Sequence, residues 1–182
     1  MDTLNHCVLL DRDGVINRDL PGSVCSTSDF ELLPGAGKAI AELNRKGYHV
    51  LVITNQACIG RGDLAAATLE AIHEQLQRHL ARLGGRIDRF YVCPHVDEDN
   101  CDCRKPRAGL IERAYEDYGF ERAATWMIGD SERDVEAALS AGCRAGLVRS
   151  GKNTDGGLRP EVPLFDDLAH FAREIEDQRK AS

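Results

Sequence analysis

The sequence has little of what several protein classes require. Only 5% of its 182 residues are aromatic, and its basic residues are outnumbered by acidic ones, which leaves a net charge of −7. A general nucleic-acid binder needs cations for phosphates and aromatic rings for bases, so we expect no nucleic-acid partner. No apolar run approaches the span of about 18 residues that crosses a membrane. The N-terminal MDTLNHCVLLDRD also lacks the basic start of a signal peptide. We therefore expect no membrane partner and a cytoplasmic location.

Cysteine is frequent but unsuited to a disulfide framework. The chain has seven cysteines, an odd number, whereas a small secreted scaffold usually has an even one. Three of them crowd into residues 93–103 beside His95. This clustering favours a reduced protein with a metal site.

Short apolar runs alternate with segments of helical periodicity. Runs at 7–10, 50–53, 90–92, 125–128 and 145–148 are almost continuously apolar, as expected of strands covered on both faces. Helices are expected at 35–46, 64–83, 108–118, 132–141 and 166–177, with Asp63 capping the second. The alternation predicts an α/β fold with a doubly wound parallel sheet, in a single domain over residues 1–182. Only 35 residues separate Thr54 from Phe90, so we expect no large cap domain.

Polar side chains follow three of the predicted strands. Asp11, Thr54 and Asp130 each come at the end of an apolar run. In open α/β sheets, ligands bind beyond the carboxyl ends of the strands. We therefore expect these three residues to meet at one site.

The segment Asp11-Arg12-Asp13-Gly14 places two carboxylates two residues apart at a strand end. One carboxylate can act as a nucleophile and the other as a proton donor. Because adjacent carboxylates repel each other, Mg²⁺ is the natural neutralising ion. Taken alone, the segment could equally be a solvated turn.

Three further segments add groups that suit a phosphoryl substrate. The hydroxyl of Thr54 and the charge of Lys105 suit phosphoryl oxygens. Asp130 would supply a third carboxylate to a Mg²⁺ site. Ser131-x-x-Asp134 has the spacing of a capping box, so Asp134 is either a functional residue or a helix cap.

The segments DRDGVIN, ITNQ, RKP and GDSERD, in this order, resemble the four signature motifs of the haloacid dehalogenase superfamily over roughly residues 7–150. That resemblance implies a Rossmann-like fold and a Mg²⁺-dependent phosphatase that forms an aspartyl phosphate. Asp11 would be the nucleophile and Asp13 the general acid and base. Asp11, the backbone carbonyl of Asp13, and Asp130 would hold Mg²⁺, and Thr54 and Lys105 would stabilise the phosphoryl group.

Cys93, His95, Cys101 and Cys103 form the pattern Cys-x-His-x5-Cys-x-Cys. Three thiolates and one imidazole make a closed tetrahedral Zn²⁺ set, which implies a structural role. Reduced core cysteines are the alternative, but the intervening residues are too polar for a core. The loop at 93–103 ends directly at Arg104 and Lys105, so zinc would position the phosphate-binding lysine.

Together with the CPH and CDC segments, the motifs resemble a branch that acts on D-glycero-D-manno-heptose 1,7-bisphosphate or on histidinol phosphate. The resemblance favours removal of the heptose 7-phosphate, a step toward the lipopolysaccharide core, with histidinol phosphate as the alternative. The partner is then a small phosphorylated sugar. Matching to the family places substrate contacts on Asp19, Leu20, Pro21, Gly22, Asn55, Gln56, Ala57, Arg104 and Ser131.

A receiver-type signalling domain also carries an acceptor aspartate on such a sheet. It would need no zinc loop, and it would retain its phosphoaspartate instead of releasing phosphate. The loop composition is compatible with a monomer, which we expect.

Overall fold

The fold is built on a parallel sheet, as the sequence predicts. The computed structural model describes residues 6–152 and 159–177. The expectation that there is no signal peptide falls partly on residues 1–5, which lie outside the described residues. Within the described part, six strands pair in the order β3-β2-β1-β4-β5-β6, all in parallel. They are β1 Cys7–Leu10, β2 His49–Asn55, β3 Arg89–Cys93, β4 Trp126–Gly129, β5 Arg144–Val148 and β6 Leu164–Phe165.

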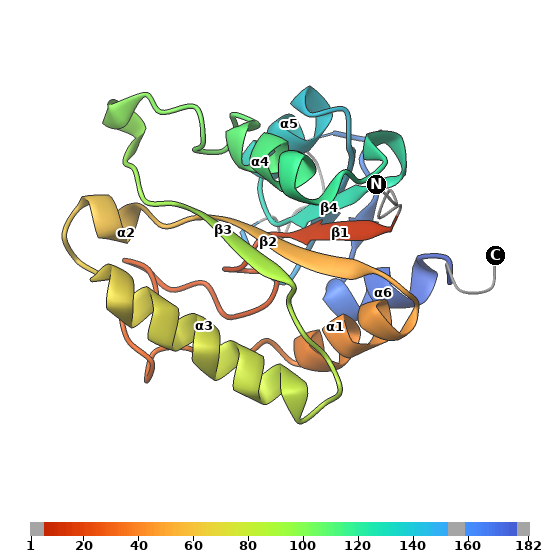
Figure 1. The fold of residues 1–182 in the computed structure, drawn as a ribbon, viewed down its shortest axis with the longest axis horizontal. Helices are drawn as coiled ribbons and strands as arrows, with labels where there is room; N and C mark the ends of the chain where they lie inside the picture. Colours follow the sequence, from red (N-terminus) through yellow and green to blue (C-terminus); the bar gives the residue numbers. More distant parts are fainter. Residues whose placement is uncertain (1–5, 153–158, 178–182) are drawn as a thin grey trace.

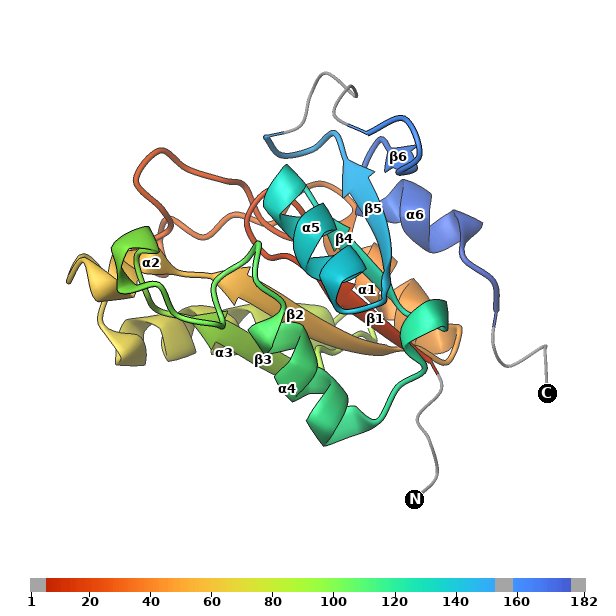
Figure 2. The same ribbon diagram turned by 90° about the horizontal axis from the view of Figure 1, so that it is seen from above.

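Helices cover both faces of this sheet (Figures 1 and 2). One face carries α1 Ala36–Arg45, α3 Ala66–Ala81 and α6 Leu168–Glu174. The other face carries α4 Gly109–Tyr118 and α5 Glu132–Ser140. Three short turns of helix complete the order of elements: α2 Ala57–Gly60, η1 Asp97–Asp99 and η2 Arg122–Ala124.

Most strand positions are apolar because each strand faces two cores. Successive side chains of a strand point to opposite faces. In β1, Val8 and Leu10 accordingly join the core under α1 and α3, whereas Cys7 and Leu9 join the core under α4 and α5. All four side chains are at most 1% exposed. This double burial accounts for the continuous apolar runs in the sequence.

One local expectation was wrong, and one short strand had not been predicted. Helix α3 begins at Ala66 with Ala65 at its N-cap position, so Asp63 does not cap it; Asp63 pairs instead with Arg61 at 2.8 Å. The short strand β6 was not expected, because two residues carry no periodic signal. It pairs with the end of β5, where Leu147 lies opposite Leu164.

The strand order positions the site. Strands β1 and β4 are neighbours at the centre of the sheet, where the order reverses, and ligands bind at such a switch point. Residues 56–88, between β2 and β3, form α2 and α3 and no cap domain. No helix in the described part is both long and apolar enough to cross a membrane.

Candidate active site

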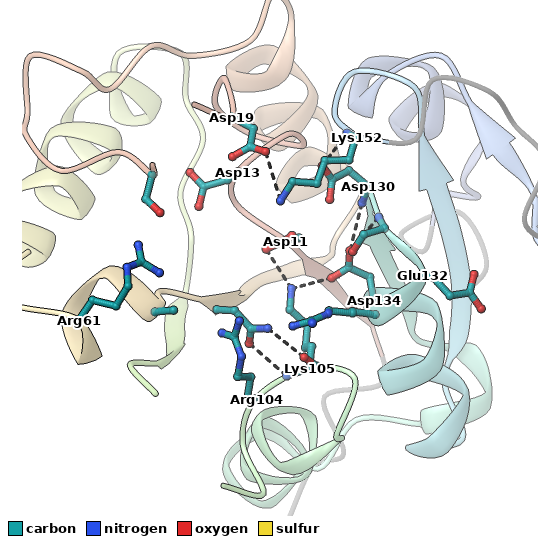
Figure 3. A pocket seen from close by; sticks show the side chains of 15 residues that line it. Asp11, Asp13, Asp19, Arg61, Arg104, Lys105, Asp130, Glu132, Asp134 and Lys152 are labelled. Carbon is teal, nitrogen blue, oxygen red and sulfur yellow. Dashed lines mark hydrogen bonds and ion pairs between the residues drawn. The ribbon is translucent and has the colours of Figure 1, made fainter. Parts of the chain in front are cut away.

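Three carboxylates converge at the switch point. Asp11 follows β1, Asp130 follows β4, and Asp134 lies in the first turn of α5. Each offers one oxygen within 4.8 Å of the others. They line a cavity of about 420 Å³ together with Asp13 and Lys105 (Figure 3). Residues that are distant in the sequence therefore meet at one edge of the sheet, as expected.

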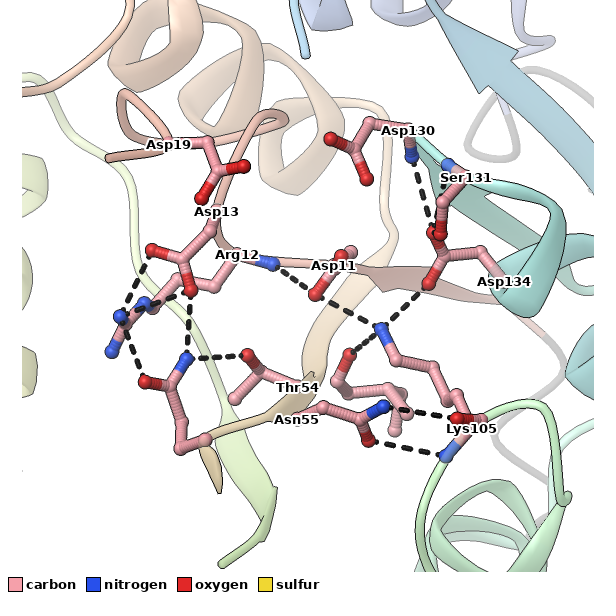
Figure 4. Close-up of polar contacts among 12 residues, drawn as sticks. Asp11, Arg12, Asp13, Asp19, Thr54, Asn55, Lys105, Asp130, Ser131 and Asp134 are labelled. Atoms are coloured by element: carbon pink, nitrogen blue, oxygen red, sulfur yellow. Dashed lines mark hydrogen bonds and ion pairs between the residues drawn. The ribbon is translucent and has the colours of Figure 1, made fainter. Parts of the chain in front are cut away.

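Lys105 lies buried among these carboxylates (Figure 4). Its Nζ is 2.9 Å from Asp11 Oδ1 and 2.6 Å from Asp134 Oδ1, and it donates to the Ile53 carbonyl at 2.8 Å. Burial disfavours the ammonium, but the two carboxylates outweigh burial and raise the pKa of Lys105 above its ordinary value. The lysine therefore stays charged.

The backbone of Lys105 is held from strand β2. Asn55 accepts a hydrogen bond from the Lys105 amide at 3.1 Å, and its side-chain nitrogen donates to the Lys105 carbonyl at 3.0 Å. This double contact ties the loop that follows residues 93–103 to the end of β2. Asn55 also lines the cavity.

Asp13 lines the same cavity, but its side chain has different hydrogen-bond partners from that of Asp11. Its carboxylate accepts from Arg12 Nη2 at 2.9 and 3.1 Å, from Asn17 at 2.8 Å and from Gln56 at 2.7 Å. Burial opposes ionisation, but the Arg12 charge and these hydrogen bonds hold the pKa of Asp13 below its usual range. The two carboxylates of the Asp-x-Asp motif therefore have distinct environments.

The sequence patterns did not predict the buried residues that hold Arg12 beside Asp13. Arg12 is completely buried, and its Nη1 lies 3.4 Å from Nε2 of His73 on α3. The His73 ring stacks on Phe90 with centroids 4.0 Å apart. Burial and the Arg12 charge lower the pKa of His73 to about 4, so its neutral ring accepts from Arg12. The only available signal was an arginine between two aspartates.

Thr54 and Gln56 were expected at the site, but both are buried and neither lines the cavity. Thr54 is fully buried, and its hydroxyl accepts from Gln56 Nε2 at 2.9 Å. Gln56 Oε1 accepts from Arg12 at 3.2 Å, and its amide also donates to Asp13. The Gln56 side chain does not line the cavity; it aligns Asp13 and Thr54.

Asp134 caps α5 and also contacts the buried lysine of the cavity. Its Oδ2 accepts from the backbone of Asp130 and Ser131 and from the Ser131 hydroxyl at 2.8 Å, which caps α5. Its Oδ1 holds Lys105. Asp11 and Asp130 therefore remain as the carboxylates with capacity for a cation.

Asp11 and Asp130 have the chemistry of a site for a hard cation. Burial raises the pKa of Asp11 above its ordinary value, with Lys105 opposing and the neighbouring carboxylates adding to the shift. Burial also raises the pKa of Asp130 to about 6, although the Lys152 amide donates to it at 2.8 Å. A divalent cation would remove this penalty. Gly14 and Gly151 pack so close to Asp130 that a Cβ on either would overlap its carboxylate.

The cysteines of the loop at 93–103 converge with His95. The three Sγ atoms lie 3.3–3.6 Å from one another, and His95 Nδ1 lies 3.3 Å from Cys103 Sγ. Thiolates on a tetrahedral zinc are about 3.8 Å apart, so this set needs little adjustment to enclose an ion. All four ligand atoms lie within 4.8 Å of one another. The cluster could therefore hold zinc.

The expected substrate contacts other than Gln56 divide between two adjoining cavities. Asp19, Asn55, Ala57, Arg104 and Ser131 line the cavity with Asp11. Leu20, Pro21 and Gly22, again with Asp19, line a second cavity of about 760 Å³. Five further residues line the first cavity and were not among the expected contacts: Ser23, Arg61, Glu132, Arg133 and Lys152.

Comparison with known proteins agrees with this geometry. Residues 102–171 match the HAD-hydrolase-like family model. The D-glycero-beta-D-manno-heptose-1,7-bisphosphate 7-phosphatase of Pseudomonas putida is 40% identical over 171 residues, which cover 92% of this chain and 98% of that protein. The D-glycero-alpha-D-manno-heptose-1,7-bisphosphate 7-phosphatase of Mycobacterium bovis is 40% identical over 173 residues, covering 91% and 89%.

A solved structure has the same fold. The D,D-heptose 1,7-bisphosphate phosphatase of B. bronchiseptica, complexed with magnesium and phosphate, matches with a TM-score of 0.88 and 39% identity, over 92% of this chain and 96% of that one. Fold and site thus define a hydrolase of the haloacid dehalogenase type. Within that superfamily, the chain belongs to the family of sugar-bisphosphate phosphatases that these relatives represent. The resemblance seen in the motifs is confirmed.

The buried contact of His73 predicts a pH-dependent part of the stability. Its pKa is lowered from 6.5 to about 4 in the folded state, so the unfolded chain binds more protons between these values. This part of the free energy of unfolding is complete above pH 6.5 and is lost as the pH falls toward 4. His73→Gln should reduce the difference in unfolding free energy between pH 7 and 4.5 by on the order of 2 kcal/mol.

Urea unfolding at the two pH values measures this effect. His79→Gln, an exposed histidine on the same helix, is the matched control and should leave the difference unchanged. An unchanged difference in His73→Gln would contradict a neutral buried ring.

Proposed function

We propose that this phosphatase removes the 7-phosphate of D-glycero-D-manno-heptose 1,7-bisphosphate. The observation that carries the proposal is the pair of carboxylates at the end of β1, with Lys105 2.9 Å from the first of them, in a chain 37–42% identical to phosphatases of this name. Relatives named for the beta and for the alpha anomer match about equally well. The proposal therefore covers the heptose without its anomer.

In the first step, a carboxylate oxygen of Asp11 attacks phosphorus, and an aspartyl phosphate forms as the bond to the sugar oxygen breaks. Lys105 and the Thr54 hydroxyl stabilise the transferring phosphoryl oxygens. Asp13 is ionised in the free site, so it first takes up a proton and then gives that proton to the departing sugar oxygen. Because Lys105 already contacts Asp11, the charge that stabilises the transferred group is in place before substrate arrives.

In the second step, Asp13 acts as the base. It takes a proton from the water that attacks the phosphorus of the aspartyl phosphate, and the bond to Asp11 breaks to release inorganic phosphate. Arg12, Asn17 and Gln56 hold the Asp13 carboxylate in one orientation for both steps. A magnesium ion held by Asp11, Asp130 and the backbone carbonyl of Asp13 would supply further neutralisation of phosphoryl charge.

Asp13→Asn tests the division of roles. The variant retains Asp11, so phosphoenzyme should form, but its hydrolysis should slow and kcat should fall by roughly 10²–10⁴-fold. Intact-protein mass spectrometry of acid-quenched enzyme detects the phosphoenzyme. Asp11→Asn is the control, in which no phosphoenzyme forms; wild-type turnover in Asp13→Asn would contradict the assignment.

The four ligands at Cys93, His95, Cys101 and Cys103 are proposed to hold one structural zinc ion. A closed set leaves no position for substrate, so the ion stabilises the loop that leads into Lys105. Elemental analysis should find about one zinc per chain in the wild type. Cys101→Ser should lower that content, whereas Cys143→Ser, a buried cysteine outside the loop, should retain it. Equal zinc in both variants would refute the ligand set.

Three further proposals concern the whole chain. The two cores share one sheet, which supports a single domain. The abundance of cysteine in a metal-binding arrangement supports a reducing compartment, the cytoplasm. We also propose that the enzyme works as a monomer on a small phosphorylated sugar.

Comparison of kcat/KM tests the substrate. Both anomers of heptose 1,7-bisphosphate, histidinol phosphate and a set of simple sugar phosphates are assayed with Mg²⁺ by phosphate release. One of the heptose bisphosphates should be preferred by roughly two orders of magnitude, because each buried polar contact discriminates strongly. A preference for histidinol phosphate would overturn the proposed substrate.

A further inference from the structure

Four cations other than Lys105 line the cavity, and they are not equally neutralised. Arg61 pairs with Asp63 at 2.8 Å, and Lys152 lies 3.3 Å from Asp19. Each of these cations has a carboxylate of its own. Arg104 and Arg133, in contrast, share a single carboxylate.

That shared carboxylate is Asp97. Its Oδ1 accepts from Arg104 Nε at 2.7 Å and from Arg133 Nη1 at 3.0 Å, and its Oδ2 accepts from Arg133 Nη2 at 3.3 Å. The neighbouring acid on α5, Glu132, is bound to Arg159 instead. Two guanidinium groups and one carboxylate leave a surplus positive charge at the rim of the cavity.

The two arginines come from different elements. Arg104 directly follows the loop at 93–103, and its Nη1 also donates to the His95 carbonyl at 3.3 Å. Arg133 is the second residue of α5, where the helix N-terminus adds positive potential. Asp97, in η1 between His95 and Cys101, links the loop to the helix.

The two arginines differ in exposure. The side chain of Arg104 is 15% exposed, and that of Arg133 is 48% exposed. Exposed ion pairs contribute little to stability, so stability gives no strong reason for the pairing of Arg133 with Asp97. A planar guanidinium held at one edge still presents other N–H groups to a phosphate, which it can bind through two parallel hydrogen bonds.

We propose that Arg133, aligned by Asp97, binds the phosphate group of the substrate that is not transferred, beside Arg104. Asp97 is then a positioning residue: its carboxylate lets two like charges lie side by side and directs both toward the cavity. This inference rests on the proposed function, because it requires a substrate with two phosphates. It makes Arg133 a determinant of specificity for bisphosphates.

Arg133→Ala is compared with wild type on heptose 1,7-bisphosphate and on heptose 7-phosphate, which lacks the second phosphate. For the bisphosphate, kcat/KM should fall roughly 10- to 100-fold, mainly through KM, as expected for loss of a charge-assisted contact. For the monophosphate it should change less than about twofold. Arg133→Lys should recover part of the loss, because lysine retains the charge but lacks the paired N–H donors of the guanidinium.

Arg82→Ala, an exposed arginine beside the end of α3, is the matched control and should leave both substrates unaffected. If Arg133→Ala lowers kcat/KM equally for the two substrates, or for neither, the assignment of Arg133 is overturned while the proposed function stands. If wild type cleaves neither heptose phosphate, the proposed function and this inference both fall.

Asp97→Asn tests the positioning role. Asparagine removes the charge that aligns the arginines, so KM for the bisphosphate should rise while kcat for the monophosphate and the zinc content stay unchanged. If Asp97 merely competed with phosphate for the arginines, KM for the bisphosphate would fall instead. That result would overturn the positioning role.

Discussion

The buried ammonium of Lys105 is the contact on which the site depends. It joins Asp11 after β1, Asp134 in α5 and the Ile53 carbonyl of β2, and so ties three separate elements together. Without this cation, the carboxylates gathered at the switch point would repel one another in a region of low dielectric. The lysine is in turn held by Asn55 and by the loop at 93–103. The same buried charge of Lys105 therefore holds the fold together at this point and faces the cavity.

A second buried cation organises the other half of the motif. Arg12 holds Asp13 and Gln56, and a neutral His73 lies behind it. Asp11 and Asp13 are separated by a single residue, yet the pKa of one is raised and that of the other is lowered. At Asp11, burial and the neighbouring carboxylates outweigh Lys105, whereas at Asp13 the Arg12 charge and the hydrogen bonds outweigh burial. A nucleophile needs the ionised form, which a divalent cation beside Asp11 and Asp130 would favour.

At the rim of the cavity, a carboxylate and cations from different elements again pair with each other. Asp97 lies within the loop that carries the four metal-ligand candidates, and it reaches Arg133 across 36 positions of sequence. The loop thus connects to the site twice, through Lys105 and through Asp97. In the proposed function, the loop would therefore position groups for both the transferred phosphoryl group and the rest of the substrate.

The parallel α/β sheet, the residues at the strand ends and the spacing of the Cys/His ligands could all be predicted from sequence patterns. These features are local: continuous apolar runs reflect double burial, and ligand spacing lies within eleven residues. Three contacts became visible only in three dimensions: Asp134 holds Lys105, Arg12 contacts Asp13 and His73, and Arg133 shares Asp97 with Arg104. Such pairings depend on which strands are neighbours and where loops close. Periodicity along the chain carries no information about either, because it records burial and not the identity of the partner.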